Sequence, residues 1–89
     1  MTSSPKFKLV QEIVADAKRT APRDNMVHYL CRRLKNKGFL PSHYETERKP
    51  PKVGDEFNDF IVVWVGKTKE GLPAYNGFRS VVLIDRKYF

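Results

Sequence analysis

The spacing of apolar residues changes at Gly38, and this change most limits the folds that the chain can adopt. Before Gly38, apolar side chains recur every three or four residues, as in amphipathic helices; after it, they gather in short runs rich in Val, Ile and Phe, as in strands. A chain of 89 residues suits one domain, residues 1–89. We therefore expect an α+β fold in which two N-terminal amphipathic helices pack on a C-terminal antiparallel β-hairpin or three-stranded sheet.

The first helix is predicted over residues 5–21. Ser4 can cap its free amides, Pro5 suits its first turn, and Pro22 ends it. Its apolar face consists of Phe7, Val10, Ile13, Val14, Ala17 and Ala21. Because this face needs a partner, we expect the helix to form an antiparallel or crossed pair with the next one.

The second helix is predicted over residues 24–37. Its apolar stripe follows the spacing i, i+3, i+4 and i+7 and consists of Val27, Leu30, Cys31 and Leu34. Gly38 is a good left-handed terminator, and Phe39 falls where a Schellman motif would pack it against Leu34.

A basic, proline-containing linker is predicted over residues 40–54. Ser42 and Glu45 allow one capped helical turn within it, and Pro50 and Pro51 stop anything longer. The linker thus separates the helices from the sheet.

The sheet is predicted over residues 55–86. Its two strands lie at 57–65 and 78–84, the Asn76-Gly77 pair favours a tight turn, and residues 72–75 can add a short edge strand. Both strands are apolar on both sides of the pleat, so two helices cover one face and something else must cover the other. A homodimer is one solution, and the alternative is cover from within the chain by Phe39, Leu40, Leu72, Tyr75, Tyr88 and Phe89.

The order helix, helix, hairpin loosely resembles winged-helix domains, in which a basic helix precedes a two-stranded wing. A third helix is not evident in this chain, so the resemblance concerns the arrangement of elements and implies no docking geometry.

The net charge is concentrated in residues 18–52. This segment holds ten basic and three acidic side chains, a balance of +7 that equals the formal charge of the whole chain. Clustered Lys and Arg attract phosphates through counterion release, so the segment predicts a polyanion-binding surface.

The outward face of the second helix is the strongest functional signal. On a helical wheel Tyr29 lies on this face between Arg32 and Arg33, so we expect both arginines to be exposed. Arginine forks match phosphates and guanine edges, and tyrosine can stack on a base. The predicted nucleic-acid-binding residues are Lys18, Arg19, Arg23, Asn25, Tyr29, Arg32, Arg33, Lys35, Asn36, Lys37, Arg48, Lys49 and Lys52. The competing interpretation is a solvated cationic face and a soluble hinge.

Catalysis and metal binding lack a supporting pattern. No nucleophile elbow, phosphate loop or carboxylate pair is evident, and His28, Cys31 and His43 are too few for a structural zinc site. We expect no enzymatic activity, cofactor or metal. The single cysteine and the lack of a long apolar run lead us to expect a cytoplasmic protein that does not enter membranes.

Two functions remain open. The first is a small non-enzymatic nucleic-acid-binding protein, with or without a regulatory role, that lays the basic helix and linker on a phosphate backbone, with duplex DNA ahead of structured RNA. The alternative is an interaction module, an inhibitor or accessory factor, that docks its basic face on an acidic patch of a larger machine such as a polymerase or ribosome. Charge alone does not separate the two.

Overall fold

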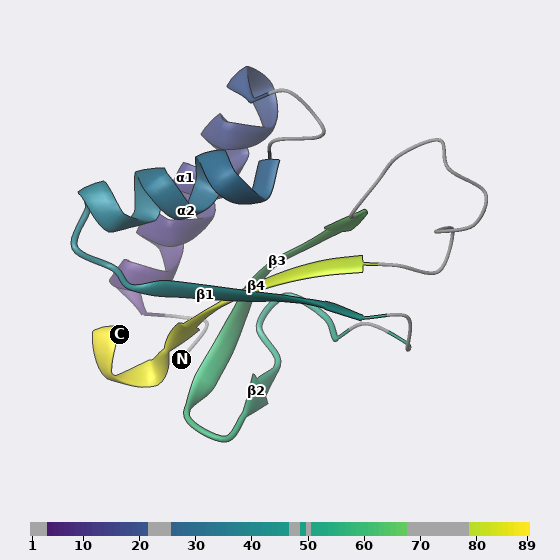
Figure 1. The fold of residues 1–89 in the computed structure, drawn as a ribbon. Helices are drawn as coiled ribbons and strands as arrows, with labels where there is room; N and C mark the ends of the chain where they lie inside the picture. Colours follow the sequence, from purple (N-terminus) through teal and green to yellow (C-terminus); the bar gives the residue numbers. More distant parts are fainter. Residues whose placement is uncertain (1–3, 22–25, 47–48, 50, 68–78) are drawn as a thin grey trace.

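The computed structural model describes residues 4–21, 26–46, 49, 51–67 and 79–89. Two helices are followed by an antiparallel sheet with the strand order β1-β4-β3-β2 (Figure 1), which confirms the α+β class. In chain order the elements are α1 (Pro5–Thr20), α2 (Met26–Asn36), β1 (Pro41–Thr46), β2 (Glu56–Phe57), β3 (Phe60–Lys67), β4 (Arg79–Asp85) and the 3-10 turn η3 (Arg86–Tyr88).

Helix α1 begins and ends close to the predicted residues. The Ser4 hydroxyl accepts a hydrogen bond from the Phe7 amide at 3.2 Å, and Pro5 occupies the first turn, where its missing N–H costs nothing. At the other end the Ala21 amide donates to the Ala17 carbonyl at 2.8 Å. The helix buries Phe7, Val10, Ile13, Val14 and Ala17, which are five of the six residues of the predicted face.

Helix α2 ends in the predicted Schellman motif. Gly38 has a φ of 90°, its amide donates to the Lys35 carbonyl at 3.0 Å, and the Phe39 amide donates to the Leu34 carbonyl at 3.0 Å. Leu34 and Phe39 are both buried in the same core cluster. These bonds are local, so the sequence is sufficient to predict them.

The buried stripe of α2 differs from the predicted one. Met26, Leu30 and Leu34 are buried, whereas Val27 and Cys31 are only partly buried. At 100° per residue the centre of the buried face lies about 50° from the expected centre. The reason is Met26, which the predicted stripe omitted and which draws the helix toward its own side.

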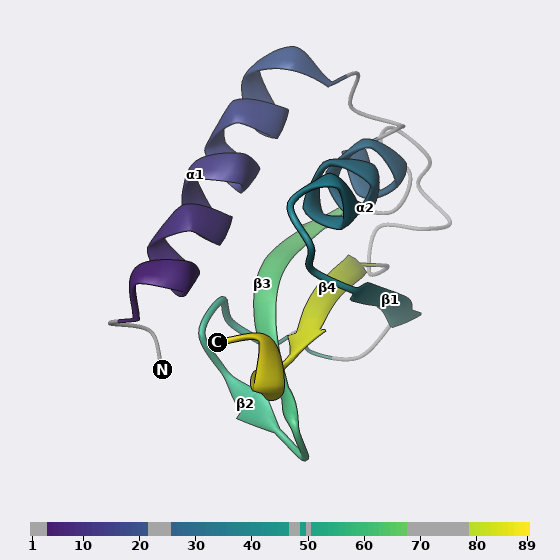
Figure 2. The ribbon, with the colours of Figure 1, turned by 90° about the vertical axis from the view of Figure 1, so that its left-hand side faces the viewer.

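The two helices pack against each other as a crossed pair (Figures 1 and 2). Their contacts follow opposite orders along the two helices. The Thr20 hydroxyl donates to the Tyr29 hydroxyl at 3.1 Å, Arg33 pairs with Asp16, and Ile13 shares a small cleft with Asn36 and Lys37. The end of α1 therefore lies beside the start of α2, and the two helices run antiparallel.

Strand β1 lies inside the segment that was predicted to be a linker, so that prediction is wrong for residues 41–46. β1 pairs antiparallel with β4, from Pro41 opposite Ile84 to Thr46 opposite Arg79. Its four central side chains are exposed, so it lacks the apolar alternation by which strands are recognised. Pairing with β4 makes it a strand, and Pro41 is tolerated because it is the first residue of an edge strand.

Strands β3 and β4 form the predicted hairpin, but the first strand, predicted over 57–65, is divided by a turn: Phe57 belongs to the short fourth strand β2, and β3 begins at Phe60. A two-residue connection at Asn58 and Asp59 joins β2 to β3, and Asn58 adopts a φ of 55°, which asparagine tolerates. The Asn76-Gly77 turn and the edge strand predicted at 72–75 lie outside the described residues.

A β-bulge at Val63 divides the apolar run of β3 between the two sides of the sheet. Val62 is opposite Leu83 and Trp64 is opposite Val82, so Val63 is the extra residue. As a result both Val63 and Trp64 belong to the helix-side core, as Ile61 does, while Val62 belongs to the other side. The Gln11 side-chain amide donates to the Val63 carbonyl at 3.2 Å, which ties α1 to the bulge.

The C-terminus closes the helix-side core. The Phe89 ring lies 5.9 Å from the ring of Phe7 and 6.0 Å from that of Phe39, centroid to centroid. Tyr88 packs against the same cluster. Phe39, Tyr88 and Phe89 therefore cover the face that the helices also cover, and the prediction that they fold over the opposite face is wrong.

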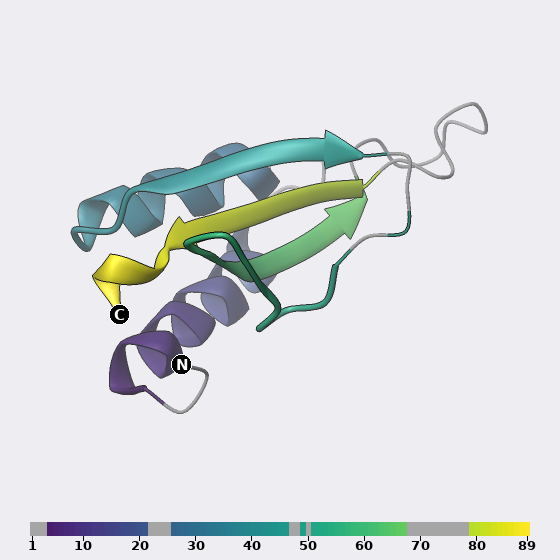
Figure 3. The ribbon, with the colours of Figure 1, turned by 90° about the horizontal axis from the view of Figure 1, so that it is seen from below.

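The opposite face of the sheet is buried within the single chain. Val62 and Val81 are fully buried and Leu83 is 6% exposed, with Phe60 and Val65 packed beside them. The part of the chain around β2, residues 51–59, passes in front of this face in the view from below (Figure 3). The expected bare surface is absent at these residues, which removes the reason for the homodimer; the oligomeric state stays a prediction for light scattering to test.

Candidate nucleic-acid interface

The exposed face of α2 carries cations without counter-charges. Arg32, Lys35 and Lys37 are exposed, and residues 26–38 contain no Asp or Glu. Within the described part of the chain none of the three forms an ion pair, whereas Arg19, Arg33 and Arg86 do. Asn36, also exposed, adds a donor and an acceptor beside them. We call Arg32, Lys35, Asn36 and Lys37 the α2 basic face; Lys35 lies on its β1 side, and Asn36 and Lys37 lie on its α1 side.

Tyr29 and Arg33 lie in the seam between the helices, so the expectation that both arginines point outward is wrong for Arg33. The Arg33 guanidinium lies 2.5 Å from the Asp16 carboxylate and donates to the Tyr29 hydroxyl at 3.3 Å. Its carbon lies 5.7 Å from the centre of the Tyr29 ring. The rotation of α2 toward Met26 brings this side of the helix against α1.

The Tyr29 hydroxyl accepts two hydrogen bonds in the seam. The hydroxyl of Thr20 and, second to it, the guanidinium of Arg33 hold the pKa of Tyr29 below its ordinary value. The bond from Thr20 links α1 to α2, and the bond from Arg33 links two successive turns of α2. Tyr29 is therefore part of the helix contact and is not an exposed stacking platform.

The last turn of α1 adds two exposed cations. Lys18 is exposed, and the Arg19 side chain, 76% exposed, lies 3.5 Å from the Asp16 carboxylate. Asp16 thus faces two guanidinium groups, those of Arg19 and Arg33. An exposed pair of this kind is weak, so Arg19 can exchange Asp16 for a phosphate at little cost.

Of the linker cations, Lys52 lies away from the α2 basic face. Lys49 and Lys52 are exposed; the Lys52 amide donates to the Asp55 carboxylate at 2.9 Å, and Gly54 donates to the Val62 carbonyl of β3 at 2.8 Å. This part of the connection runs along β3 on the side away from β4, whereas α2 contacts β1 and β4. At about 4.8 Å per strand, β1 lies roughly 14 Å from this edge, so the α2 basic face and Lys52 do not form one continuous surface. The predicted contacts at Arg23, Asn25 and Arg48 lie outside the described residues.

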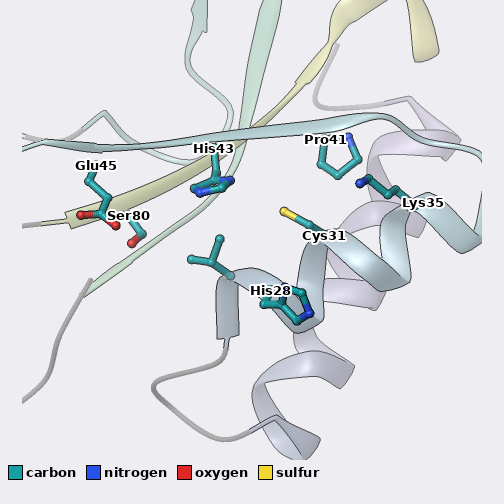
Figure 4. Close-up of a pocket in the computed structure, with 8 residues that line it drawn as sticks. His28, Cys31, Lys35, Pro41, His43, Glu45 and Ser80 are labelled. Atoms are coloured by element: carbon teal, nitrogen blue, oxygen red, sulfur yellow. The ribbon is translucent and has the colours of Figure 1, made fainter.

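A groove lies beside the α2 basic face, between α2 and β1 (Figure 4). It has a volume of about 400 Å³ and is lined by Val27, His28, Cys31, Lys35, Pro41, His43, Glu45 and Ser80. Lys35 belongs both to the groove and to the α2 basic face. Sequence reasoning missed the groove because it treated β1 as linker, and the alternation of Pro41, His43 and Glu45 was the available signal.

The groove offers polar contacts and one thiol. Cys31 is partly buried, and burial raises the pKa of its thiol, an effect that the nearby Lys35 charge partly opposes. The thiol is therefore a poor nucleophile at neutral pH. Among the described residues, no three His, Cys, Asp or Glu side chains are placed to hold a metal ion.

No protein-family model, curated protein or solved structure matches this chain. The likeness to winged-helix domains therefore rests on the order of elements alone. Of the two described helices, neither combines the length and the apolar character needed to cross a membrane.

Proposed function

We propose that this protein is a non-enzymatic nucleic-acid-binding protein that lays the α2 basic face on a phosphate backbone. The observation that supports this proposal is the absence of counter-charges: Arg32 and Lys35 on α2 and Lys37 directly after it are exposed, and α2 carries no acid. Each can neutralise one phosphate and release its condensed counterions.

Helix stability does not explain the positions of all these cations, because Arg32 lies outside the last turn of α2. A cation favours the C-terminal dipole only within the last turn, which in α2 contains Arg33 and Lys35. Arg32 lies before that turn, whereas Lys37 lies directly after it, beside the last carbonyls, where the dipole also favours a cation. Arg33 has a structural partner in Asp16, which leaves the remaining cations for a ligand.

The test compares two triple variants that remove the same amount of charge. R32A/K35A/K37A removes the cations of the α2 basic face, and K6A/K8A/K52A removes three exposed lysines from α1 and the linker. Affinity for a random-sequence oligonucleotide is measured from low to moderate salt. The dependence of log K on log salt should weaken by about 0.9 for each duplex phosphate that is no longer neutralised, or about 2.7 for the first variant, and should change little for the second. Equal effects in the two variants would show that net charge, and not this face, determines binding.

An exposed apolar side chain beside the groove supports the second candidate function, which is docking on an acidic protein surface. Leu40, next to Pro41, is 58% exposed, and protein interfaces combine such apolar contacts with a charged rim. A pull-down from nuclease-treated lysate separates the two functions: partners that remain after nuclease treatment support protein docking, and partners that disappear support the nucleic-acid proposal.

A further inference from the structure

The two walls of the groove are rows of side chains with matched spacing. Val27, Cys31 and Lys35 are four residues apart on α2, a rise of about 6 Å per step. Pro41, His43 and Glu45 are two residues apart on β1, a rise of about 6.6 Å per step. All six line the groove. The near equality of the two steps keeps the rows opposite each other along the whole groove.

The connection from α2 to β1 determines which ends meet. Only residues 37–40 separate Asn36, the last residue of α2, from Pro41, so Lys35 must lie at the Pro41 end. Glu45 then lies at the far end, and Figure 4 shows it there, with His43 and the Cys31 sulfur pointing into the space between. The groove therefore has a cation at one end, a carboxylate at the other, and the His43 ring and the Cys31 sulfur between them.

We propose that this groove binds one unpaired nucleotide of a single strand, with its phosphate on Lys35, its base against the His43 ring, and its exocyclic amino group donating to Glu45. This inference rests on the proposed function and specifies its ligand. Single-strand binders combine a cationic track for the backbone with ring surfaces on which unpaired bases stack. Lys35 joins the groove to the α2 basic face, so one strand can contact both.

The carboxylate of Glu45 decides between this ligand and others. It would repel a second phosphate or the carboxylates of an acidic peptide, whereas it can accept a hydrogen bond from a base amino group, as acidic side chains do from the N4 amino group of cytosine. Thymine presents an acceptor, O4, at the equivalent position. In a duplex the bases are paired and stacked, and a base must leave the stack to enter a concave site.

The binding test measures affinity at fixed salt for four probes: a mixed-sequence single strand, its duplex, oligo-dC and oligo-dT. We expect the single strand to bind more tightly than the duplex, and oligo-dC to bind more tightly than oligo-dT by about fivefold or more, the discrimination of one good base contact. Glu45→Gln should reduce the preference for oligo-dC. Glu12→Gln, an exposed acid of α1 outside the groove, is the matched control and should retain it.

The thiol supplies a second, direct measurement. Cys31 is the only cysteine in the chain and its sulfur points into the groove, so alkylation by iodoacetamide at alkaline pH, where the thiolate forms, reports on a single site there. Oligo-dC should slow alkylation in the wild type, and more weakly in Glu45→Gln.

Three outcomes would overturn the inference, and they can be distinguished. In the first, binding depends on salt but shows no preference for single strands and no protection of Cys31. The α2 basic face is then the binding site, and the groove does not bind a nucleotide. No binding to any oligonucleotide contradicts the proposed function as well. Protection of Cys31 by polyglutamate, without protection by oligo-dC, assigns the groove to an acidic peptide.

Discussion

Replacement of Asp16 by asparagine should change stability and nucleic-acid affinity in opposite directions. Asp16 faces the guanidinium groups of both Arg33 and Arg19, so Asp16→Asn removes the negative partner of each. The side chains of Asp16 and Arg33 are 35% and 39% exposed, which places the pair near the surface. Two partly exposed ion pairs together contribute about 1 kcal/mol to the free energy of unfolding. For a domain of this size that corresponds to a fall in Tm of about 4–8 °C.

The same change should strengthen binding to a polyanion. It deletes one negative charge next to the cationic surface and releases Arg33 to contact a phosphate. One additional contact should steepen the dependence of log K on log salt by about 0.9 for a duplex. Thermal melts followed by circular dichroism measure the first effect, and fluorescence anisotropy at several salt concentrations measures the second.

Glu12→Gln is the matched control, because it makes the same change in charge one turn earlier on α1. Glu12 is exposed and has no ion pair with any residue that the structure describes. Its variant should shift stability by no more than about 0.5 kcal/mol and leave the salt dependence unchanged. If Glu12→Gln strengthens binding as much as Asp16→Asn does, the effect comes from net charge. If Asp16→Asn lowers both stability and affinity, Asp16 positions the binding surface and the reasoning is wrong.

Two further predictions concern the core. Leu34→Ala removes a fully buried side chain that packs with α1 and Phe39, and should lower the free energy of unfolding by about 2–5 kcal/mol in a denaturant titration; a wild-type midpoint would remove Leu34 from the core. Gly66→Ala places a methyl group against the indole of Trp64, and should cost about 1–3 kcal/mol and shift the tryptophan fluorescence. Unchanged fluorescence and stability in that variant would show that the Trp64 ring lies elsewhere.

The ends of the helices and the central hairpin follow from the sequence by itself. Ser4 and Gly38 act through hydrogen bonds to residues within five positions in the chain, so no distant contact is needed to place them. The apolar runs of β3 and β4 also predict strands from the sequence, because their β-branched residues prefer this backbone and must be buried. The positive charge of residues 18–52 is likewise a property of the sequence, and by itself it predicts a polyanion-binding surface.

Only the tertiary structure decided which cations remain available to a ligand. Arg33 and Asp16 are distant in sequence and meet because Met26 rotates α2 against α1. β1 has an exposed, polar sequence and becomes a strand only by pairing with β4, which begins more than thirty residues after β1 ends. The groove depends on that pairing, since one wall is α2 and the other is β1. Contacts between distant segments leave no periodic signal in the sequence, so the groove is evident only in the folded structure.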